Sequence, residues 1–288
     1  MVLLLVKSDL NPEILNSKLF QINSMDVKIG CTGWSYEGWH GTFYPKSLES
    51  ARFLRYYSEI FDFTEINSTY YRIPNQFMVS KWNTETPKNF RFTAKFPKII
   101  THEKRLKQVQ SDVIEFLSSL SPIKQKLIAL LLQLPPSLSF QEAKPRLQEL
   151  FQYLPDNYLY PIEGRHSSWF SAEAIQFLKQ NNLCLVWNEI EGVKNPAHIT
   201  SNYIYLRLIG DRSIPEEQFG RVIKDRTYDI ERWTSRIKQQ QGSVDSVYVL
   251  ANNHFEGFAP ATANSIRERF GMSELFWEEK RQKKLGDF

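Results

Sequence analysis

The sequence of 288 residues contains only two cysteines, Cys31 and Cys184. They fall in two separate, non-adjacent predicted strands, so we expect no disulfide between them. Long apolar runs are also lacking: the run from Val2 to Val6 is too short for a signal-peptide core, and no stretch reaches transmembrane length. These absences predict a soluble protein of the reducing cytoplasm without a membrane partner.

Neither sign of charge is in large excess. The chain has 36 lysines and arginines against 32 aspartates and glutamates, which gives a net charge of +4. These charges are spread along the whole sequence, which is not the basic footprint of a DNA-binding protein. With 42% hydrophobic and 24% charged residues, the composition predicts a globular protein with a sizeable core. Charge alone therefore does not favour nucleic acid as a partner.

Several motifs that identify cofactor sites and nucleophiles are absent as well. Neither the glycine-rich dinucleotide fingerprint nor the phosphate-binding P-loop occurs, so nothing indicates a nucleotide cofactor. The segment from Gly33 to Gly38 is one residue too long for the nucleophile elbow of serine hydrolases. No H-E-x-x-H spacing is present. We expect no cofactor and no metal held by protein ligands.

What the sequence does contain is a repeated alternation of strand and helix. Apolar, β-branched or aromatic runs alternate with polar loops and segments of helical periodicity. The predicted strands span residues 27–31, 61–67, 90–96, 127–134, 158–165, 183–189, 203–210 and 246–252. Helix-start signals precede the connecting helices, for example the capping box of Ser139 and Glu142. Eight such units predict an α/β fold, an eight-stranded parallel (β/α)8 barrel of the TIM type.

The barrel accounts for residues 25–288 as one predicted domain. Residues 1–24 form a predicted N-terminal extension, in which Asn11 and Pro12 indicate the start of a short helix, and Met25 is an alternative start of the protein. The connection after the sixth strand leaves room only for a shortened sixth helix. The connection after the seventh strand, residues 211–226, is a long basic loop that we interpret as a lid.

Polar side chains occur at most of the predicted strand ends. In this fold the active site lies at the C-terminal ends of the strands. The polar residues alternate with apolar ones that face the helices, so we expect them to point into the barrel mouth. They are Glu65, Asn67, Lys95, Gln133, Glu163, Arg165, Arg207, Asn252, Asn253 and His254.

The loop after the first strand, residues 32–46, is rich in aromatic side chains around three glycines. Its first aromatic residue, Trp34, could stack on a sugar or a base of a ligand. The alternative is an aromatic plug that closes the barrel mouth, because large aromatic side chains more often pack than bind. Both interpretations stay open at this stage.

Six segments carry a resemblance that covers Met25 to about Phe270. In chain order they read GCTGWSYEGWHGTFYP, EINSTYY, FRFTAKFPKIITH, LLLQLPPS, EGRHSSW and ANNHFEG. Together they resemble the YecE-like family, domain of unknown function 72. The resemblance implies a TIM-type barrel and no particular reaction. It also implies a pocket built from Glu65, Lys95, Gln133, Glu163, Arg165, His166, Asn252 and Asn253.

Three residues depart from the pattern that the resemblance implies. Gly164 stands where a bulkier residue is usual, Asn188 where an aspartate is common, and Ile209 where a histidine often lies. We therefore expect no role in this chain that needs the usual side chains at those three positions.

The leading hypothesis is an acid/base enzyme, with hydrolase, lyase or isomerase chemistry, that acts on a small polar or anionic molecule. Glu65 and Glu163 would face each other across the substrate as base and acid, with Lys95 as the third catalytic residue. A Schiff base at Lys95 would need a depressed pKa, which the neighbouring carboxylates oppose. The predicted substrate-binding residues are Trp34, Gln133, Arg165, His166, Arg207, Asn252 and Asn253.

The basic loop adds an expectation about anions. Its residues Arg212, Arg221, Lys224 and Arg226, together with Arg207, predict a site for phosphate, sulfate or carboxylate. An anion should stabilise the protein against heat, and Arg207→Ala should abolish that effect while leaving the fold intact.

Three alternatives remain. A metal-dependent phosphodiesterase or nucleic-acid processing enzyme would use Glu65, Glu163, His166 and His254 as ligands, although the cations in the same mouth would repel a metal. A second alternative is a buried charge network with a purely structural role. The third is a non-catalytic ligand-binding barrel.

Overall fold

The computed structural model describes residues 25–277, so the predicted extension over residues 1–24 lies outside the described residues. Its strands form one parallel sheet in the order β5-β4-β3-β2-β1-β8-β7-β6. A parallel bridge between Ile162 and Leu185 joins the two ends of this order and nearly closes a TIM-type barrel. The strands are β1 (Asp26–Cys31), β2 (Phe63–Ile66), β3 (Arg91–Lys95), β4 (Leu127–Gln133), β5 (Ile162–Glu163), β6 (Trp187–Ile190), β7 (Tyr203–Gly210) and β8 (Ser246–Ala251).

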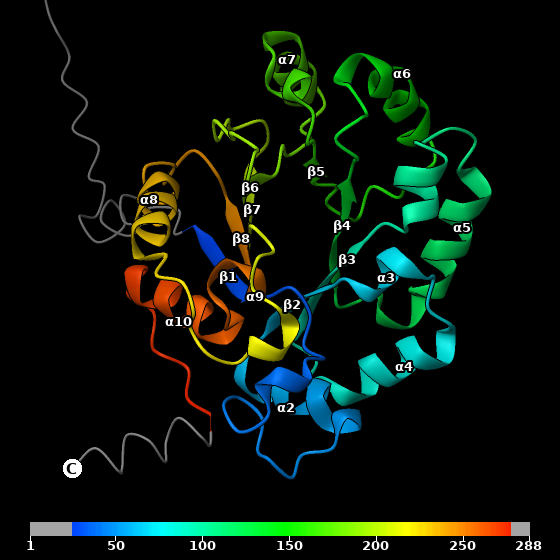
Figure 1. The fold of residues 1–288 in the computed structure, drawn as a ribbon. Helices are drawn as coiled ribbons and strands as arrows, with labels where there is room; N and C mark the ends of the chain where they lie inside the picture. Colours follow the sequence, from blue (N-terminus) through cyan, green and yellow to red (C-terminus); the bar gives the residue numbers. More distant parts are fainter. Residues whose placement is uncertain (1–24, 278–288) are drawn as a thin grey trace, which may run out of the picture.

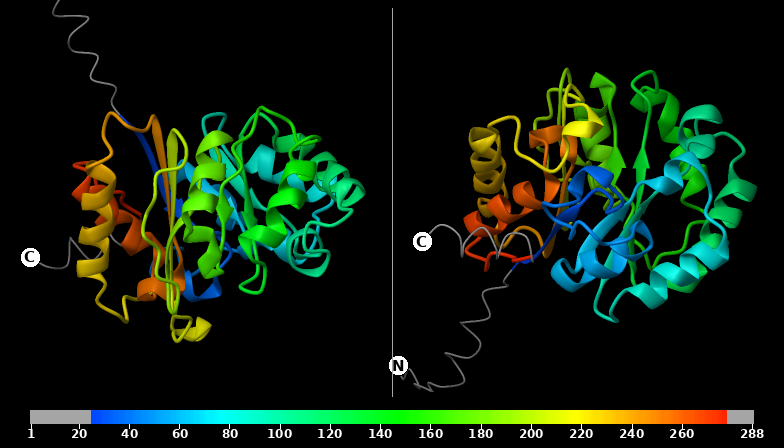
Figure 2. Two further views of the ribbon diagram at one scale, coloured as in Figure 1. Left: turned by 90° about the horizontal axis from the view of Figure 1, so that it is seen from above. Right: turned by 60° about the horizontal axis from the view of Figure 1, so that its bottom comes forward.

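Helices surround the strands on the outside (Figures 1 and 2). The longer ones are α2 (Phe53–Ile60), α4 (Gln76–Glu85), α5 (Gln110–Ser119), α6 (Phe140–Leu150), α7 (Ala172–Gln180), α8 (Thr227–Lys238) and α10 (Ala259–Arg269). Two short helices, α3 (Ser68–Tyr71) and α9 (Asn253–Glu256), follow the ends of β2 and β8 directly. Half of the predicted capping box of α6 is present. Ser139 Oγ accepts a hydrogen bond from the Glu142 backbone N–H, whereas the Glu142 carboxylate accepts from Arg105 and Arg146.

The interior of the barrel is apolar at its base and polar at its mouth. On β7, Tyr203 and Tyr205 belong to an inner cluster that also includes Leu131 of β4. Because side chains alternate along a strand, the next inward positions are Arg207 on β7 and Gln133 on β4. This register places the polar strand ends at the mouth, above a packed floor.

Two predicted elements differ from the observed ones. The predicted strand 158–165 is reduced to Ile162–Glu163, because Pro161 cannot donate a ladder hydrogen bond. The shortened sixth helix is not present: residues 191–202 contain no helix. Side chains hold this connection to the barrel instead, since Asn195 Nδ2 donates to the Val186 carbonyl and Trp187 Nε1 to the His198 carbonyl.

Both cysteines are buried and free, as expected. Cys31 ends β1, whereas Cys184 precedes β6. Within residues 25–277, no helix combines the length and the apolar character that crossing a membrane requires.

The ring of Trp169 leaves no room for a side chain at position 164, where this chain has glycine. A Cβ at this position would lie 2.2 Å from Trp169 Cγ, and Trp169 is fully buried with its Nε1 donating to the Leu138 carbonyl. In this chain Trp169 fills the space that a bulkier residue 164 would need.

We expect Gly164→Ala to lower the free energy of unfolding by about 1–3 kcal/mol, because the added methyl group overpacks the site. Urea denaturation of the variant measures this. The matched double variant, Gly164→Ala with Trp169→Leu, should cost less than the sum of the two single variants. If the stability losses of the two single variants simply added, the Trp169 ring would not be the cause of the loss in Gly164→Ala.

Candidate functional site

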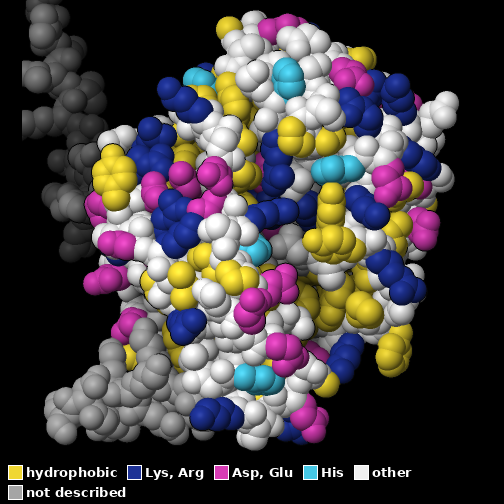
Figure 3. All heavy atoms as spheres, in the orientation of Figure 1, with side chains coloured by type: hydrophobic (Ala, Val, Ile, Leu, Met, Phe, Trp, Pro, Cys, Tyr) yellow, Lys and Arg dark blue, Asp and Glu magenta, His cyan; other side chains and the backbone are white. Residues whose placement is uncertain are grey.

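A cavity of about 350 Å³ opens at the C-terminal ends of the strands. Figure 3 shows lysine and arginine side chains gathered near the middle of the face seen there, among histidine, acidic and hydrophobic ones. The polar strand ends predicted from the sequence supply half of the cavity lining: Asn67, Lys95, Gln133, Arg165, Arg207, Asn252 and His254. The other lining residues are Tyr36, Tyr70, Tyr71, Ile209, Arg212, Glu216 and Phe219.

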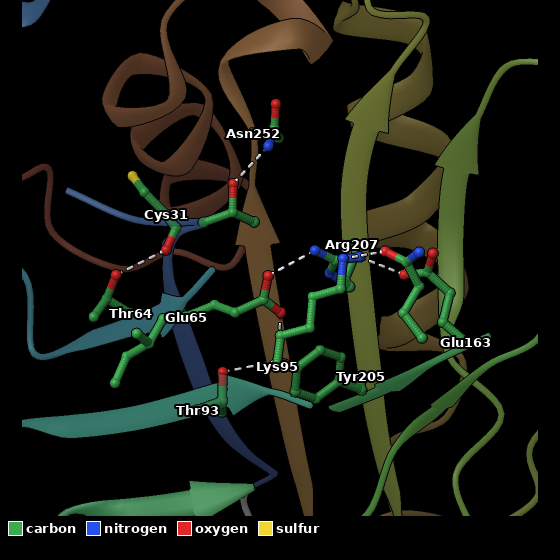
Figure 4. A network of polar contacts seen from close by, with 12 residues as sticks. Cys31, Thr64, Glu65, Thr93, Lys95, Glu163, Tyr205, Arg207 and Asn252 are labelled. Atoms are coloured by element: carbon green, nitrogen blue, oxygen red, sulfur yellow. Dashed lines mark hydrogen bonds and ion pairs between the residues drawn. The ribbon is translucent and has the colours of Figure 1, made fainter. Parts of the chain in front are cut away.

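Arg207 of β7 lies between the two carboxylates that we expected to face each other across a substrate (Figure 4). Its Nη2 is 2.6 Å from Glu65 Oε1, and its Nη1 donates to Glu163 Oε2. Both glutamates are completely buried and neither lines the cavity. The expected acid/base geometry is therefore wrong: a cation separates the carboxylates, since two buried carboxylates without one would be very costly.

Glu163 is also held by a second cation. Arg165 donates from Nε to Glu163 Oε1 at 2.7 Å. Burial opposes the ionisation of Glu163, but Arg165 and Arg207 outweigh it and lower the pKa of this carboxyl to about 2. Burial likewise opposes the charge of Arg207, yet Glu65 and Glu163 raise the pKa of its guanidinium above its usual range. Glu163 and Arg207 are thus charged at neutral pH, and Glu163 cannot donate a proton there.

Lys95 is the last residue of β3 and, unlike Arg165 and Arg207, forms no ion pair with a glutamate within residues 25–277. It is buried, with 8% of its surface exposed, and its Nζ donates to Gln133 Oε1 at 2.5 Å. The Nζ also lies 3.8 Å from the centre of the Tyr70 ring. Burial and then Arg207 lower the pKa of Lys95 from 10.5 to about 7, against the opposing effect of Glu163 and Glu65. The carboxylates do oppose the shift, as expected, but they do not prevent it.

The aromatic loop after β1 mainly packs. Trp34 does not line the cavity and lies edge-on to Trp82, with 5.9 Å between ring centroids. Trp39 and Phe43 are completely buried in the core. Tyr36 is the aromatic residue of this loop that reaches the cavity, whereas Trp34, the expected substrate-binding residue, packs as the plug alternative predicts.

Two further predicted binding residues stabilise loops instead of lining the cavity. His166 Nδ1 accepts a hydrogen bond from the Ser168 backbone N–H. Asn253 Oδ1 accepts from Trp39 Nε1 and from the Ala259 backbone N–H, both at 3.0 Å. Asn252 does line the cavity.

Asn188 of β6 was not predicted to face inward beside the polar residues of the site. It is 1% exposed, and within the described residues neither atom of its side-chain amide has a hydrogen-bond partner. Its register partner on β7 is Arg207, whose Nε has none either. Strand parity could have revealed it, since Trp187 and Glu189 both contact helix α8, which leaves Asn188 facing inward.

The basic loop after β7 is less available for anions than its composition suggests. Asp211 accepts hydrogen bonds from Lys224 and Arg226. Arg212 is the cation of this loop that lines the cavity. Residues 25–277 form no ion pair with Arg212.

The proposed metal ligands are not brought together. No group of three or more histidine, cysteine, aspartate and glutamate side chains in residues 25–277 is arranged to hold a metal ion. His254 Nδ1 lies 3.0 Å from the Ile214 carbonyl oxygen instead.

Comparison with known proteins finds one protein family and several relatives that are similar to this chain. A family model described as "Protein of unknown function DUF72" matches residues 28–284. The chain is 32% identical to UPF0759 protein YecE of Escherichia coli (strain K12) over 145 residues, 50% of this chain, and spans about half the length of that relative. UPF0759 protein YunF of Bacillus subtilis (strain 168) is 23% identical over 270 residues, which cover 84% of this chain and 94% of YunF.

Solved structures of two DUF72 family proteins are similar in fold. TM1631 from Thermotoga maritima MSB8 has a TM-score of 0.74 and 27% identity, and the match covers 85% of this chain and 99% of TM1631. EF0366 from Enterococcus faecalis V583 has a TM-score of 0.69 and 23% identity, covering 87% of this chain and all of EF0366. Both matches support the TIM-type barrel.

Proposed function

The chain belongs to the DUF72 family, as its motifs predict, and from its pocket we propose that it is an enzyme that binds a small anionic molecule and uses Lys95 as its base. The observation that carries this proposal is the environment of Lys95. Its buried Nζ lines the cavity beside a neutral amide, Gln133, and the face of a neutral ring, Tyr70. A lysine with a pKa of about 7 is partly neutral at neutral pH, where a base is most effective.

The charges of the mouth support an anionic substrate. Glu65 and Glu163 balance Arg207 and Arg165. The remaining charged lining residues are Arg212, Lys95 and Glu216. Because Lys95 is partly protonated, their positive charge exceeds the single negative charge of Glu216 and favours an anionic ligand. The cavity volume is at the lower end of the range for small-molecule sites.

In this proposal Glu65 and Glu163 support the site and do not transfer protons. They fix Arg207 at the base of the cavity, and Tyr205 Oη adds a hydrogen bond of 2.8 Å to Glu65 Oε2. The fixed guanidinium in turn keeps the carboxylates away from Lys95 Nζ, so that neither forms an ion pair with it within residues 25–277.

A non-catalytic ligand-binding barrel would need the same anion site but no neutral amine. Turnover of any compound that stabilises the wild type, and its loss in Lys95→Met with binding retained, would favour the enzyme. Binding without turnover would favour the alternative.

Phosphate, sulfate or small dicarboxylates at constant ionic strength are expected to raise the melting temperature. A ligand at 100 times its Kd should stabilise the protein by about 2.7 kcal/mol. Arg212→Gln should weaken this effect because Arg212 lines the cavity, whereas Arg221→Gln, in the same loop but outside the lining, should not. A thermal-shift screen measures both. No shift from any anion, or equal shifts in all three proteins, would contradict an anion-binding mouth.

A further inference from the structure

We propose that Lys95 forms an imine with its substrate, and that this substrate is a small aldehyde or ketone that carries a carboxylate or phosphate group. The inference rests on the proposed function, in which Lys95 meets an anionic molecule in the barrel mouth. It goes further, because it names the bond that Lys95 forms and the chemical class of its partner.

The surroundings of the Lys95 amine favour attack on a carbon atom. A lysine that is paired with a carboxylate stays protonated and has no free electron pair. Here Arg207 occupies the carboxylates of Glu65 and Glu163, and Lys95 Nζ contacts the amide oxygen of Gln133 and the ring of Tyr70. Neither contact supplies the negative charge that would hold the ammonium form.

A second buried lysine shows the contrasting case. Lys126 is 7% exposed, but its Nζ donates three hydrogen bonds, to the Asn83 carbonyl, the Thr86 carbonyl and Thr86 Oγ1, at 2.7, 2.8 and 3.0 Å. All of its ammonium protons are engaged, and it does not line the cavity at the barrel mouth. Burial alone therefore does not make a lysine of this chain accessible to a ligand.

The cations of the mouth fit the charged end of such a substrate. Arg165 and Arg212 line the same cavity as Lys95 and can bind a carboxylate or phosphate while the carbonyl carbon lies at Nζ. An iminium ion formed next to Arg207 would add a positive charge. The negative charge that the substrate brings offsets it, so an anionic carbonyl compound is favoured over a neutral one.

The step balances without an oxidant or a further reactant. The electron pair of the neutral amine forms a C–N bond, while the electrons of the C=O π bond move to the oxygen atom. The nitrogen then gives up its two protons, the oxygen leaves with them as water, and a C=N double bond remains. A proton taken up from the solvent by the imine nitrogen gives the iminium ion. The water leaves through the open mouth of the cavity.

Reductive trapping tests the inference. The full-length protein is incubated at pH 7 with sodium cyanoborohydride and one of three probes: glyoxylate, pyruvate or uncharged propanal. Hydride reduces the C=N bond, so the protein gains the mass of the probe less one oxygen atom. We expect glyoxylate and pyruvate to label the peptide that contains Lys95 on the order of a hundred times faster than those that contain Lys126 or Lys124.

Two variants sharpen the result. Lys95→Arg should abolish the adduct while circular dichroism confirms the fold, and Arg212→Gln should slow labelling by pyruvate but not by propanal. Labelling spread evenly over many lysines would overturn the inference, as would no adduct at Lys95 with any probe.

The pKa of Lys95, measured by titration, distinguishes failure of the imine proposal from failure of the proposed function. If Lys95 titrates near pH 7 but forms no adduct, the imine is wrong and Lys95 as a base stands. If Lys95 titrates near pH 10, both proposals fail.

Discussion

Lys95→Met is expected to raise the free energy of unfolding by about 2–3 kcal/mol at pH 7. Lowering the pKa of a buried lysine from 10.5 to about 7 costs the folded state roughly 4–5 kcal/mol when the unfolded chain carries the charged form. Methionine avoids this cost but leaves Gln133 Oε1 without its donor, which takes back about 2 kcal/mol. Urea denaturation at several pH values measures the difference.

The pH dependence of this effect has a definite sign. Because the folded pKa of Lys95 lies below the unfolded one, the unfolded chain binds more protons between pH 7 and pH 10.5. The wild type therefore gains stability as the pH rises through this window, by about 1.4 kcal/mol per pH unit. The advantage of Lys95→Met should disappear at about pH 9 and reverse above pH 10.5, where only the lost hydrogen bond to Gln133 remains.

Lys126→Met is the matched control, with the opposite expected sign. Burial lowers the pKa of Lys126 as well, but the variant also removes three hydrogen bonds from its ammonium group, so the free energy of unfolding should fall by about 2–3 kcal/mol. If Lys95→Met destabilised the protein as much as Lys126→Met, Lys95 would be a satisfied ammonium group and the account of the site would be wrong.

Arg207→Met is expected to lower the free energy of unfolding by about 3–5 kcal/mol, because it leaves Glu65 and Glu163 buried without their shared cation. This replaces the expectation from the sequence that loss of Arg207 would leave the fold intact. The difference in free energy of unfolding between wild type and Arg207→Met should be smaller at pH 5 than at pH 7, because the buried carboxylates of the variant can then be protonated. Chemical denaturation at pH 5 and pH 7 measures it.

Two variants separate this effect from the loss of an ordinary ion pair. Arg232 is 26% exposed and pairs with Glu189 and Asp229 near the surface, so Arg232→Met should cost only about 1 kcal/mol or less. Adding Glu163→Gln to Arg207→Met should recover part of the lost stability, since it removes one buried charge. Equal losses for the two arginine variants would contradict the central role of Arg207.

The wild type should also lose stability in acid. The pKa of Glu163 is lowered to about 2 in the folded state, so its contribution is complete above pH 4.5 and disappears as the pH falls toward 2.

The barrel and the inward polar positions could be predicted from the sequence because both follow from simple periods. Strands and helices alternate along the chain except between β6 and β7, and within a strand every second side chain points inward, which locates Lys95, Gln133 and Arg207. The same rule applied to β6 would have added Asn188. The length of β5 was overestimated because Pro161 interrupts its ladder.

The pairing of charges could not be predicted in this way. Periodicity places Glu65, Glu163 and Arg207 on inward faces, but it does not say that the arginine reaches both carboxylates. Lining residues that lie outside the strands follow no strand period: Tyr70 of the short helix α3 was not predicted at the cavity, and Arg212 was predicted only as one of four basic residues of its loop.

The titration of Lys95 tests the account most directly. Its ¹⁵Nζ or ¹³Cε resonance, assigned by comparison with Lys95→Arg, can be followed by NMR in the full-length protein from pH 5 to pH 11. We expect a midpoint near pH 7, well below the ordinary lysine pKa of about 10.4. A midpoint for Lys95 near pH 10 would show that it is an ordinary ammonium group, and would contradict its role as the base of the site.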